Sequence, residues 1–430
     1  MNKQPVDMSA DAAGTQTSKT FAVALFLLGA TNLLNMLDRK IVGILAEPIK
    51  KDLALSDTQT GLLTGLAFSI CYAVCAVPIA RIADRGNRVR ILSIMLGFWS
   101  IMTVFCGLAK TFGMLLMARF GVAAGESACS PISYALISDY FEPRYRARAM
   151  SVVPLAAAIG TLLAFAVGGY LAQHFDWRMS FLLVGLPGLA LGVICWFVLP
   201  EPRLKVTPSR QNGPDESLSL RVALGQLLGR PIFVLLVAGA SAMMFSLSAL
   251  LIWSAALLQR SYGWSLSEAG LALGLIFGVG GMGAPVLASI MGDRRLQSDN
   301  GAYPYTLALL SAIAAPILLL ALFSTSAWFT LVAICCVYLL TSGWPPLVMA
   351  TFRIFTPSNN MALAVALLGT AINLLGLGLG PFCVGILSDF IVPTLGADSI
   401  RYALLPTVAV YLIASLIFYV VAARVRRGLC

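Results

Sequence analysis

The sequence is poor in charged residues and nearly lacks histidine. Asp, Glu, Lys and Arg make up 11% of the 430 residues, and His174 is the one histidine, whereas an ordinary soluble domain has about 25% charged residues. No phosphate-binding glycine loop and no set of metal-ligating side chains is present. These absences argue against nucleotide-driven and metal-dependent chemistry, so we expect no enzyme activity, no metal ion and no cofactor other than a coupling proton.

The composition is that of an integral membrane protein. Hydrophobic residues make up 59% of the chain and the mean hydropathy is +0.88. Apolar runs of about 20 residues, the length that a helix needs to cross a bilayer, recur along nearly the whole sequence. We expect an all-α membrane protein with twelve transmembrane helices. Their expected ranges are 20–47, 57–80, 90–109, 112–139, 148–173, 178–199, 231–259, 266–291, 303–323, 327–352, 362–388 and 402–422.

A polar, proline-containing segment at residues 201–230 divides these spans into two sets of six. Such a loss of apolar character is typical of a linker between domains. The expected organisation is a polar N-terminal tail at 1–19, a six-helix bundle at 20–200, a cytoplasmic linker at 201–230, a second six-helix bundle at 231–423 and a basic C-terminal tail at 424–430.

The basic residues are distributed unevenly between the two sides of the expected membrane domain. An even number of spans puts both termini on one side, and most of the 29 Lys and Arg residues fall in the loops of that side. The positive-inside rule makes this side cytoplasmic. We therefore expect a multi-pass protein of the plasma (inner) membrane with both termini in the cytoplasm. Its net charge of +10 reflects this bias and not nucleic-acid binding.

The two halves resemble each other in sequence. Residues 77–90 and 284–296, which end the second and eighth spans, each place a proline before an Asp-Arg pair. The fifth and eleventh spans are rich in small residues, which allow close helix approach, although membrane helices are generally rich in such residues. A parallel repeat of this kind places the substrate between the halves near the bilayer midplane, and the halves rock around it.

Three consecutive charged residues, Asp38, Arg39 and Lys40, interrupt the first span. An ionisable side chain near the bilayer centre costs ~2.5–3.5 kcal/mol and commonly marks a substrate or ion path. At ~1.5 Å per residue, Asp38 and Arg119 of the fourth span lie at similar depth, and Glu126 lies about two turns further along the same face. We expect Asp38 and Arg39 to share a cavity wall with these two residues of the fourth span. Lys40 is expected to point toward the outer interface or a neighbouring carboxylate.

Two interpretations of these charges remain open. In the functional one, Asp38 and Glu126 are protonation switches, because a carboxyl group that gains a proton releases its basic partner. Arg39 and Arg119 are then free to hold an anionic headgroup, bidentately where it is a phosphate. In the structural one, the charges form a static ion pair between the first and fourth spans.

The interiors of the spans in the second half contain no Asp, Glu, Lys or Arg. We place Asn373 in the substrate-binding site, among Met and aromatic side chains whose apolar wall suits an acyl chain better than a sugar. At the cytoplasmic end of the second span, Asp84, Arg85 and Arg88 are expected to form a gate between the halves. The alternative is an ordinary basic loop of the positive-inside kind.

Several of these motifs resemble those of the major facilitator superfamily. ARIADRGNR at 80–88 is similar to the family's G-x-x-x-D-R-x-G-R signature, although Ala80 replaces the leading glycine and the later glycine is shifted to Gly86. RFGVAAGE at 119–126 is similar to the Arg-bearing fourth helix. NLLNMLDRKIVGIL at 32–45 resembles the Spinster-type lipid transporters, with Lys40 in place of an aromatic residue that is common there.

This resemblance implies the major facilitator fold and the export of amphiphilic lipids, such as sphingoid phosphates or lysophospholipids, coupled to protons. The charges in the first and fourth spans also resemble those of organic-anion/proton symporters for sugar acids. We therefore predict a monomeric, proton-coupled transporter that moves an anionic amphiphilic lipid across the bilayer by alternating access. The alternatives are an organic-acid or sugar-acid proton symporter of the same superfamily and, more distantly, a non-transporting membrane receptor.

Overall fold

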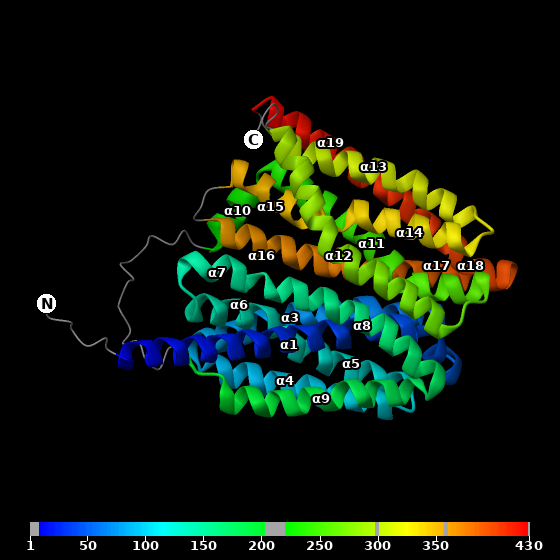
Figure 1. Ribbon diagram of the computed structural model, residues 1–430. Helices are drawn as coiled ribbons and strands as arrows, with labels where there is room; N and C mark the ends of the chain where they lie inside the picture. The colour runs from blue at the N-terminus through cyan, green and yellow to red at the C-terminus, as the bar shows by residue number, and fades with distance from the viewer. Residues whose placement is uncertain (1–7, 203–219, 297–300, 357–359, 429–430) are drawn as a thin grey trace, which may run out of the picture.

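The computed structural model describes residues 8–202, 220–296, 301–356 and 360–428, and within these ranges the chain forms helices joined by short connections, with no strand. The helices are arranged in two bundles, one above the other in Figure 1, with the start of α1 and the end of α19 at the same end of the molecule. We call this end the termini side and the other end the opposite side.

The helices of the first half are α1 (Met8–Asp52), α2 (Asp57–Gly61), η1 (Leu62–Leu66), α3 (Ala67–Arg85), α4 (Arg88–Leu108), α5 (Phe112–Glu126), α6 (Cys129–Tyr140), α7 (Pro143–Met150), α8 (Val152–His174) and α9 (Trp177–Val198). Those of the second half are α10 (Leu220–Leu228), α11 (Pro231–Tyr262), α12 (Leu266–Leu296), α13 (Ala302–Phe323), α14 (Ala327–Thr341), α15 (Trp344–Phe355), α16 (Met361–Ala371), η4 (Ile372–Gly378), α17 (Leu379–Leu395), η5 (Gly396–Asp398), α18 (Ser399–Ala403) and α19 (Leu405–Arg426).

These helices account for twelve crossings. Ten described segments are long and apolar enough to cross a membrane, and one of them, Leu363–Arg426, contains two crossings. The chain reverses between them at Gly396, whose φ of +54° is a conformation that favours glycine. The remaining crossing is the fourth, formed by α5 and α6 together. The predicted all-α fold of two six-helix bundles is confirmed.

Two helix boundaries differ from those expected at the ends of the bundles. The first helix begins at Met8, so residues 8–19, expected as a polar tail, continue α1. Residues 220–228 of the expected linker form the short helix α10. Residues 220–228 have hydrophobic residues at helical spacing, which the polar composition of their surroundings concealed.

The helix of the fourth membrane crossing is interrupted between α5 and α6. Pro131 lies in the first turn of α6, where its missing N–H cannot donate to the carbonyl oxygen of Ser127. The Ser127 hydroxyl donates to the carbonyl oxygen of Ala124 at 2.7 Å. As a result α5 ends at Glu126, which lies directly at the break.

Small residues bring helices together, as the sequence predicted. A Cβ atom on Gly160 of α8 would lie 2.3 Å from the carbonyl oxygen of Leu33 in α1. A Cβ atom on Gly169 would lie 2.5 Å from the carbonyl oxygen of Leu266 in α12. Because α1 is in the first half and α12 in the second, α8 joins the halves along its length.

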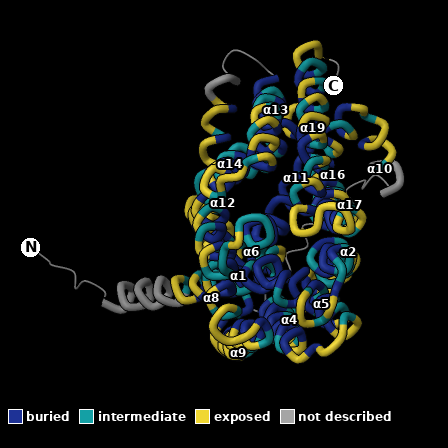
Figure 2. The backbone as a smooth tube through the Cα atoms, turned by 90° about the vertical axis from the view of Figure 1, so that its right-hand side faces the viewer, coloured by how far each residue is buried: buried dark blue, intermediate teal, exposed yellow. Residues whose placement is uncertain are grey.

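The halves also meet closely on the opposite side, where α2 and η1 pack against α17. A Cβ atom on Gly65 would lie 2.6 Å from the carbonyl oxygen of Gly378, and one on Gly385 would lie 2.3 Å from that of Asp57. In Figure 2 the central helices, among them α11, are mostly buried, whereas exposed residues lie around the outside. The charged stretch of α1 therefore lies where the two halves face each other.

Candidate functional site

The three charged residues of α1 point in two directions. Asp38 is 2% exposed and faces into the first half, beside Thr103 and Trp99 of α4. Arg39 and Lys40 are half-buried and face the second half, where both border one small cavity. Lys40, which was expected to point toward the outer interface or a neighbouring carboxylate, instead lies beside Arg39 at this cavity, where the charge of Glu126 acts on it. α1 contacts α8 of its own half and α11 of the second half. Arg39 and Lys40 are 100° apart on α1, and both can face the second half because α11 packs against this side of the helix.

Arg119 lies next to Asp38, as their similar depth predicted, but its side chain contacts the main chain of Asp38 and not the carboxyl group. Its Nη1 donates a hydrogen bond to the carbonyl oxygen of Asp38 at 3.3 Å, while Oδ1 of the Asp38 carboxyl group and Nε of Arg119 have no hydrogen-bond partner among the described residues. Arg119 is 1% exposed. The two side chains are thus neighbours in a buried environment without the direct carboxylate–guanidinium pair that a static ion pair requires.

Phe68 of α3 lies between two guanidinium groups. Its ring centre is 4.8 Å from Cζ of Arg39 and 5.0 Å from Cζ of Arg119. The ring of Tyr72, one turn further along α3, is 5.0 Å from Cζ of Arg39 and stacks on Phe68. Each such contact stabilises a desolvated cation by about 2 kcal/mol, so aromatic faces take part of the role that carboxylates play elsewhere.

Glu126 is the most isolated of the buried charged side chains. It is 1% exposed, and neither of its carboxyl oxygens has a hydrogen-bond partner among the described residues. The charges that act on it are those of Arg39, Arg119 and Lys40. Gly125 positions it, because a Cβ atom there would lie 2.7 Å from Cβ of Trp99, so α5 approaches α4 closely at this point. Glu126 can accept or release a proton without breaking a hydrogen bond to the protein.

Asn373 comes from the second half and reaches this group of charges. Its Oδ1 accepts a hydrogen bond from Nη2 of Arg39 at 3.4 Å, and its Nδ2 donates to the carbonyl oxygen of Gly369 at 2.8 Å. It lies in η4, a π-helical segment, a distortion that often occurs at functional sites. The predicted site residues of the two halves are therefore in contact.

The cavity beside Arg39 and Lys40 has a volume of about 20 Å³, which is room for about one water molecule. Both halves contribute to its wall. The lining residues other than the two cations are Thr64, Phe68, Ser69, Ser248, Leu251, Ile252 and Leu377. The second half thus offers one hydroxyl group and three aliphatic side chains, and the Ser248 hydroxyl already donates to the carbonyl oxygen of Gly376 at 2.9 Å.

The expected gate residues lie on the termini side and contact their own half. Arg88 pairs with Asp139 at the end of α6 at 2.7 Å and with Asp84 at 3.2 Å. Arg85 is exposed. These two ion pairs tie α4 to α6 and α3 within the first half, so the predicted role of Asp84, Arg85 and Arg88 between the halves stays a prediction.

Sequence reasoning missed a second cluster of charges, which joins the halves on the opposite side. We call it the Asp57 cluster; it consists of Glu47, Lys50, Asp57, Arg260, Ser388 and Asp389. Arg260 of α11 pairs with Glu47 at 2.5 Å and with Asp57 at 2.6 Å. Lys50 pairs with the same Asp57 carboxylate at 2.5 Å. Asp57 is fully buried, and its carboxylate also accepts from the Ser388 hydroxyl at 2.6 Å.

The sequence held a weak signal for this cluster. Ser56 and Gln59 form a capping box at the start of α2, which marks Asp57 as a first-turn residue. Arg260 lies close to the end of its apolar span, where a basic residue is unusual on the side that the positive-inside rule leaves poor in Lys and Arg. Neither feature indicates a partner in the other half.

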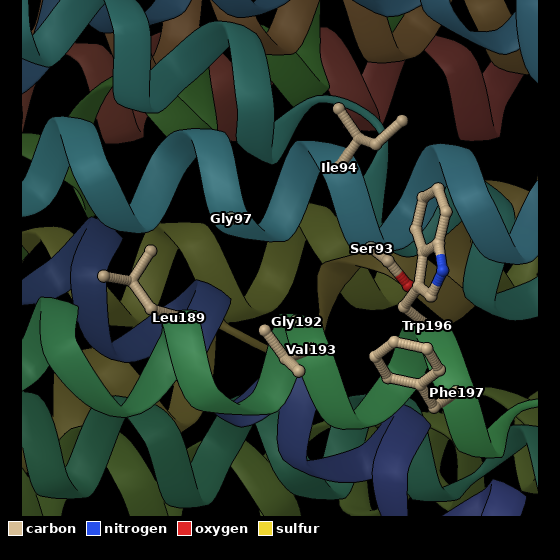
Figure 3. Close-up of a pocket in the computed structure, with 8 residues that line it drawn as sticks. All are labelled: Ser93, Ile94, Gly97, Leu189, Gly192, Val193, Trp196 and Phe197. Atoms are coloured by element: carbon tan, nitrogen blue, oxygen red, sulfur yellow. The ribbon is translucent and has the colours of Figure 1, made fainter.

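An apolar groove on the outer face of the first half, between α4 and α9, lies away from these charges (Figure 3). Its volume is about 380 Å³. Gly97 and Gly192 leave the space, and the side chains of Ile94, Val193 and Phe197 are largely exposed around it. No residue of the second half contributes to the lining, so this groove is a surface toward lipid and not the candidate site.

The sequence and the fold are both similar to those of known membrane transporters. The model of the Major Facilitator Superfamily matches residues 28–381. An MFS-type efflux pump of Mycolicibacterium smegmatis is 30% identical over 411 residues, which cover 94% of each chain. A probable L-galactonate transporter of Escherichia coli is 26% identical over 280 residues, 62% of this chain and 61% of that one. The crystal structure of a bacterial homologue of the human lysosomal transporter Spinster, in an inward-facing and unoccupied conformation, matches with a TM-score of 0.84 at 27% identity, over 95% of this chain and 98% of that one.

Proposed function

The chain belongs to the Major Facilitator Superfamily, and from this premise we propose that it is a proton-coupled transporter of an anionic amphiphilic lipid. The family and the fold make it a membrane transporter and not an enzyme. The proposed cargo is a lysophospholipid or a sphingoid phosphate, which joins an anionic headgroup to one acyl or alkyl chain. The proposed coupling ion is the proton, and the proposed working unit is the monomer.

The observation that carries this proposal is the contact between Arg39 and Asn373 beside a largely aliphatic wall. It unites a cation of the first half with a polar group of the second at the place where the halves meet. An anionic headgroup would bind the Arg39 guanidinium, whose planar fork suits phosphate oxygens. The aliphatic side chains of the second half would accept the chain of the lipid, because apolar surface is favourable to bury there.

Asp38 and Glu126 are the proposed proton carriers. Both carboxyl groups are buried, and both have oxygens without a hydrogen-bond partner among the described residues. Arg119 lies next to Asp38, and its charge also acts on Glu126. A proton that enters or leaves either carboxyl group changes the local field on Arg39 and Arg119, and so changes how strongly they attract an anionic headgroup.

We propose an alternating-access cycle in which this conformation is closed on the opposite side and opens toward the termini side. The Asp57 cluster ties the halves together on the opposite side, and Arg39 and Asn373 tie them near the middle. We propose that the termini are cytoplasmic and that the protein lies in the plasma membrane, so that this conformation faces inward. Asp84, Arg85 and Arg88 are the proposed gate that joins the halves when the cycle reaches the outward-facing state.

A sugar-acid or organic-acid proton symporter is the second candidate. Its support is the similarity to the probable L-galactonate transporter, together with the hydroxyl groups of Thr64, Ser69 and Ser248 at the cavity. Against it, the second half offers few polar groups to the several hydroxyl groups of a sugar acid, and a buried hydroxyl group without a partner is costly.

Transport by purified protein in proteoliposomes separates these candidates. Vesicles with an imposed pH gradient are offered labelled lysophospholipid, sphingosine phosphate, galactonate or hexuronate. The proposal expects lipid transport that stops when a protonophore removes the gradient, and little movement of the sugar acids. Gradient-driven uptake of sugar acid without lipid transport would establish the second candidate, and protein-free vesicles give the background rate.

A further inference from the structure

Lys40 lies between the halves without a carboxylate partner. Its side chain borders the same cavity as Arg39, and no hydrogen bond or ion pair engages its ammonium group within the described part of the chain. The charges that act on it are those of Arg39, which repels it, and Glu126, which attracts it. A cation held out of water costs several kcal/mol unless an anion accompanies it. Lys40 therefore has no carboxylate partner among the described residues in this conformation, and an anion at the cavity would favour its charged form.

The two arginines of the site are held by neutral groups. Arg39 contacts the rings of Phe68 and Tyr72 and the amide oxygen of Asn373. Arg119 bonds a main-chain carbonyl oxygen. These partners orient the guanidinium groups without cancelling their charge. Arg39 borders the cavity and can contact a ligand there, whereas the buried Arg119 acts on a ligand through its electric field.

The balance of charge at the site is positive. Arg39, Lys40 and Arg119 lie near two carboxyl groups, those of Asp38 and Glu126. When the three basic groups are charged and both carboxyl groups are ionised, the site has one positive charge in excess. When one of the carboxyl groups carries a proton, the excess is two positive charges. A phosphomonoester carries about −1.5 to −2 charges near pH 7, whereas a phosphodiester or a carboxylate carries one negative charge.

We propose that Lys40 is a specificity-determining residue that selects a phosphomonoester headgroup over a phosphodiester or a carboxylate. The inference rests on the proposed transport of an anionic amphiphile and names the headgroup which that site prefers. Arg39 binds two of the phosphate oxygens with its planar fork, and Lys40 offers a compact charge to the third. Without Lys40, and with one carboxyl group protonated, the site has one positive charge in excess and matches a headgroup with one negative charge.

The size of the cavity links headgroup binding to movement of the halves. Its volume of about 20 Å³ holds about one water molecule, which is less than a phosphate group needs. The headgroup must therefore draw the Arg39 guanidinium away from Asn373, and this hydrogen bond of 3.4 Å joins the halves at that depth. Binding of a phosphomonoester weakens a contact between the halves and so favours their separation.

Two lipids with the same acyl chain test the inference, lysophosphatidic acid as the phosphomonoester and lysophosphatidylglycerol as the phosphodiester. Transport into proteoliposomes and binding to the detergent-purified full chain are measured for both. Wild-type protein should prefer lysophosphatidic acid by about tenfold or more. Lys40→Gln should lower its transport and binding about ten- to a hundredfold, with lysophosphatidylglycerol nearly unchanged, whereas Lys40→Arg should keep most of the preference. Lys110→Gln, in the exposed connection between α4 and α5, is the matched control.

Three results would overturn the inference. Equal transport of the two lipids by wild-type protein, or an equal loss of both in Lys40→Gln, would remove the headgroup preference while leaving lipid transport in place. Transport of galactonate with no binding of either lipid would remove the proposed function together with the inference. If Lys40→Gln does not give monodisperse protein, the wild-type preference and its retention in Lys40→Arg decide the matter.

Discussion

The carboxylate of Asp389 in the second half accepts a hydrogen bond from the main-chain N–H of Asp57 in the first half at 2.8 Å, and its other oxygen accepts from that of Thr58 at 2.7 Å. The first N–H groups of a helix have no partner within it, and the helix dipole favours a negative charge there. The start of α2 is thus capped by its own Ser56 and by a residue 332 positions away. In the proposed cycle, opening of the opposite side would remove the part of this cap that Asp389 supplies.

The first prediction concerns this cap. Asp389→Asn removes the charge and one of the two acceptor oxygens, so the closed opposite side should loosen. Amide hydrogen exchange of residues 53–66, measured by mass spectrometry, should rise about tenfold, which corresponds to the loss of a charge-assisted hydrogen bond. Asp398→Asn, on the same side but paired with the nearby Arg401 in an exposed position, should leave this exchange unchanged. Equal exchange in all three proteins would show that closure does not depend on the cap.

The second prediction concerns Arg260 at the centre of the Asp57 cluster. Arg260→Gln removes the cation that pairs with the buried Glu47 and leaves Asp57 with Lys50 and the Ser388 hydroxyl. Removal of one partner from a buried ion pair costs roughly 3–5 kcal/mol, so the apparent melting temperature of the purified protein should fall clearly. Arg144→Gln breaks an exposed pair with Glu142 and should shift it little. Adding Glu47→Gln to Arg260→Gln should recover part of the loss, and further destabilisation would contradict the pairing.

The sequence predicted the central charges because they contrast with their surroundings. Asp38, Arg119 and Glu126 stand out in apolar segments, and counting residues along two antiparallel helices correctly placed Asp38 and Arg119 at similar depth. Counting residues did not predict that Lys40 borders the same cavity as Arg39. A helical wheel gives the angle between residues but not which neighbouring helix each one faces, and this depends on how α1 packs between α8 and α11.

The Asp57 cluster was missed for a different physical reason. Glu47, Asp57 and Asp389 lie near helix ends, where charged residues are ordinary because they contact water, headgroups or helix dipoles. Their significance comes from meeting one another across the two halves, and Arg260 lies 203 positions from Asp57. No local pattern in a single sequence carries that information.

The third prediction concerns proton coupling. Glu126→Gln and Asp38→Asn keep the size of each side chain but cannot exchange a proton. Net transport driven by a pH gradient should fall to the rate without a gradient, because the proton no longer alters the field on the arginines. Exchange of labelled for unlabelled substrate at equal pH should persist, since it needs no net proton movement. Gradient-driven transport at the wild-type rate in both variants would exclude these carboxyl groups as the proton carriers. Glu268→Gln, at an exposed turn on the opposite side, serves as the control.

The fourth prediction concerns the close approach of the halves at Gly65. A Cβ atom at this position would lie 2.6 Å from the carbonyl oxygen of Gly378, and a main-chain atom cannot move aside as a side chain can. Gly65→Ala should therefore push η1 away from η4 and favour opening of the opposite side, which would raise hydrogen exchange of residues 53–66. Gly97→Ala is the matched control, because a Cβ atom there has no neighbour within 4 Å. Gly97→Ala should leave the free energy of unfolding unchanged or raise it by about 0.4–1 kcal/mol, because alanine lowers the conformational entropy of the unfolded chain. If the two substitutions affected exchange equally, the contact between the π-helical segments would not set the balance between the two conformations.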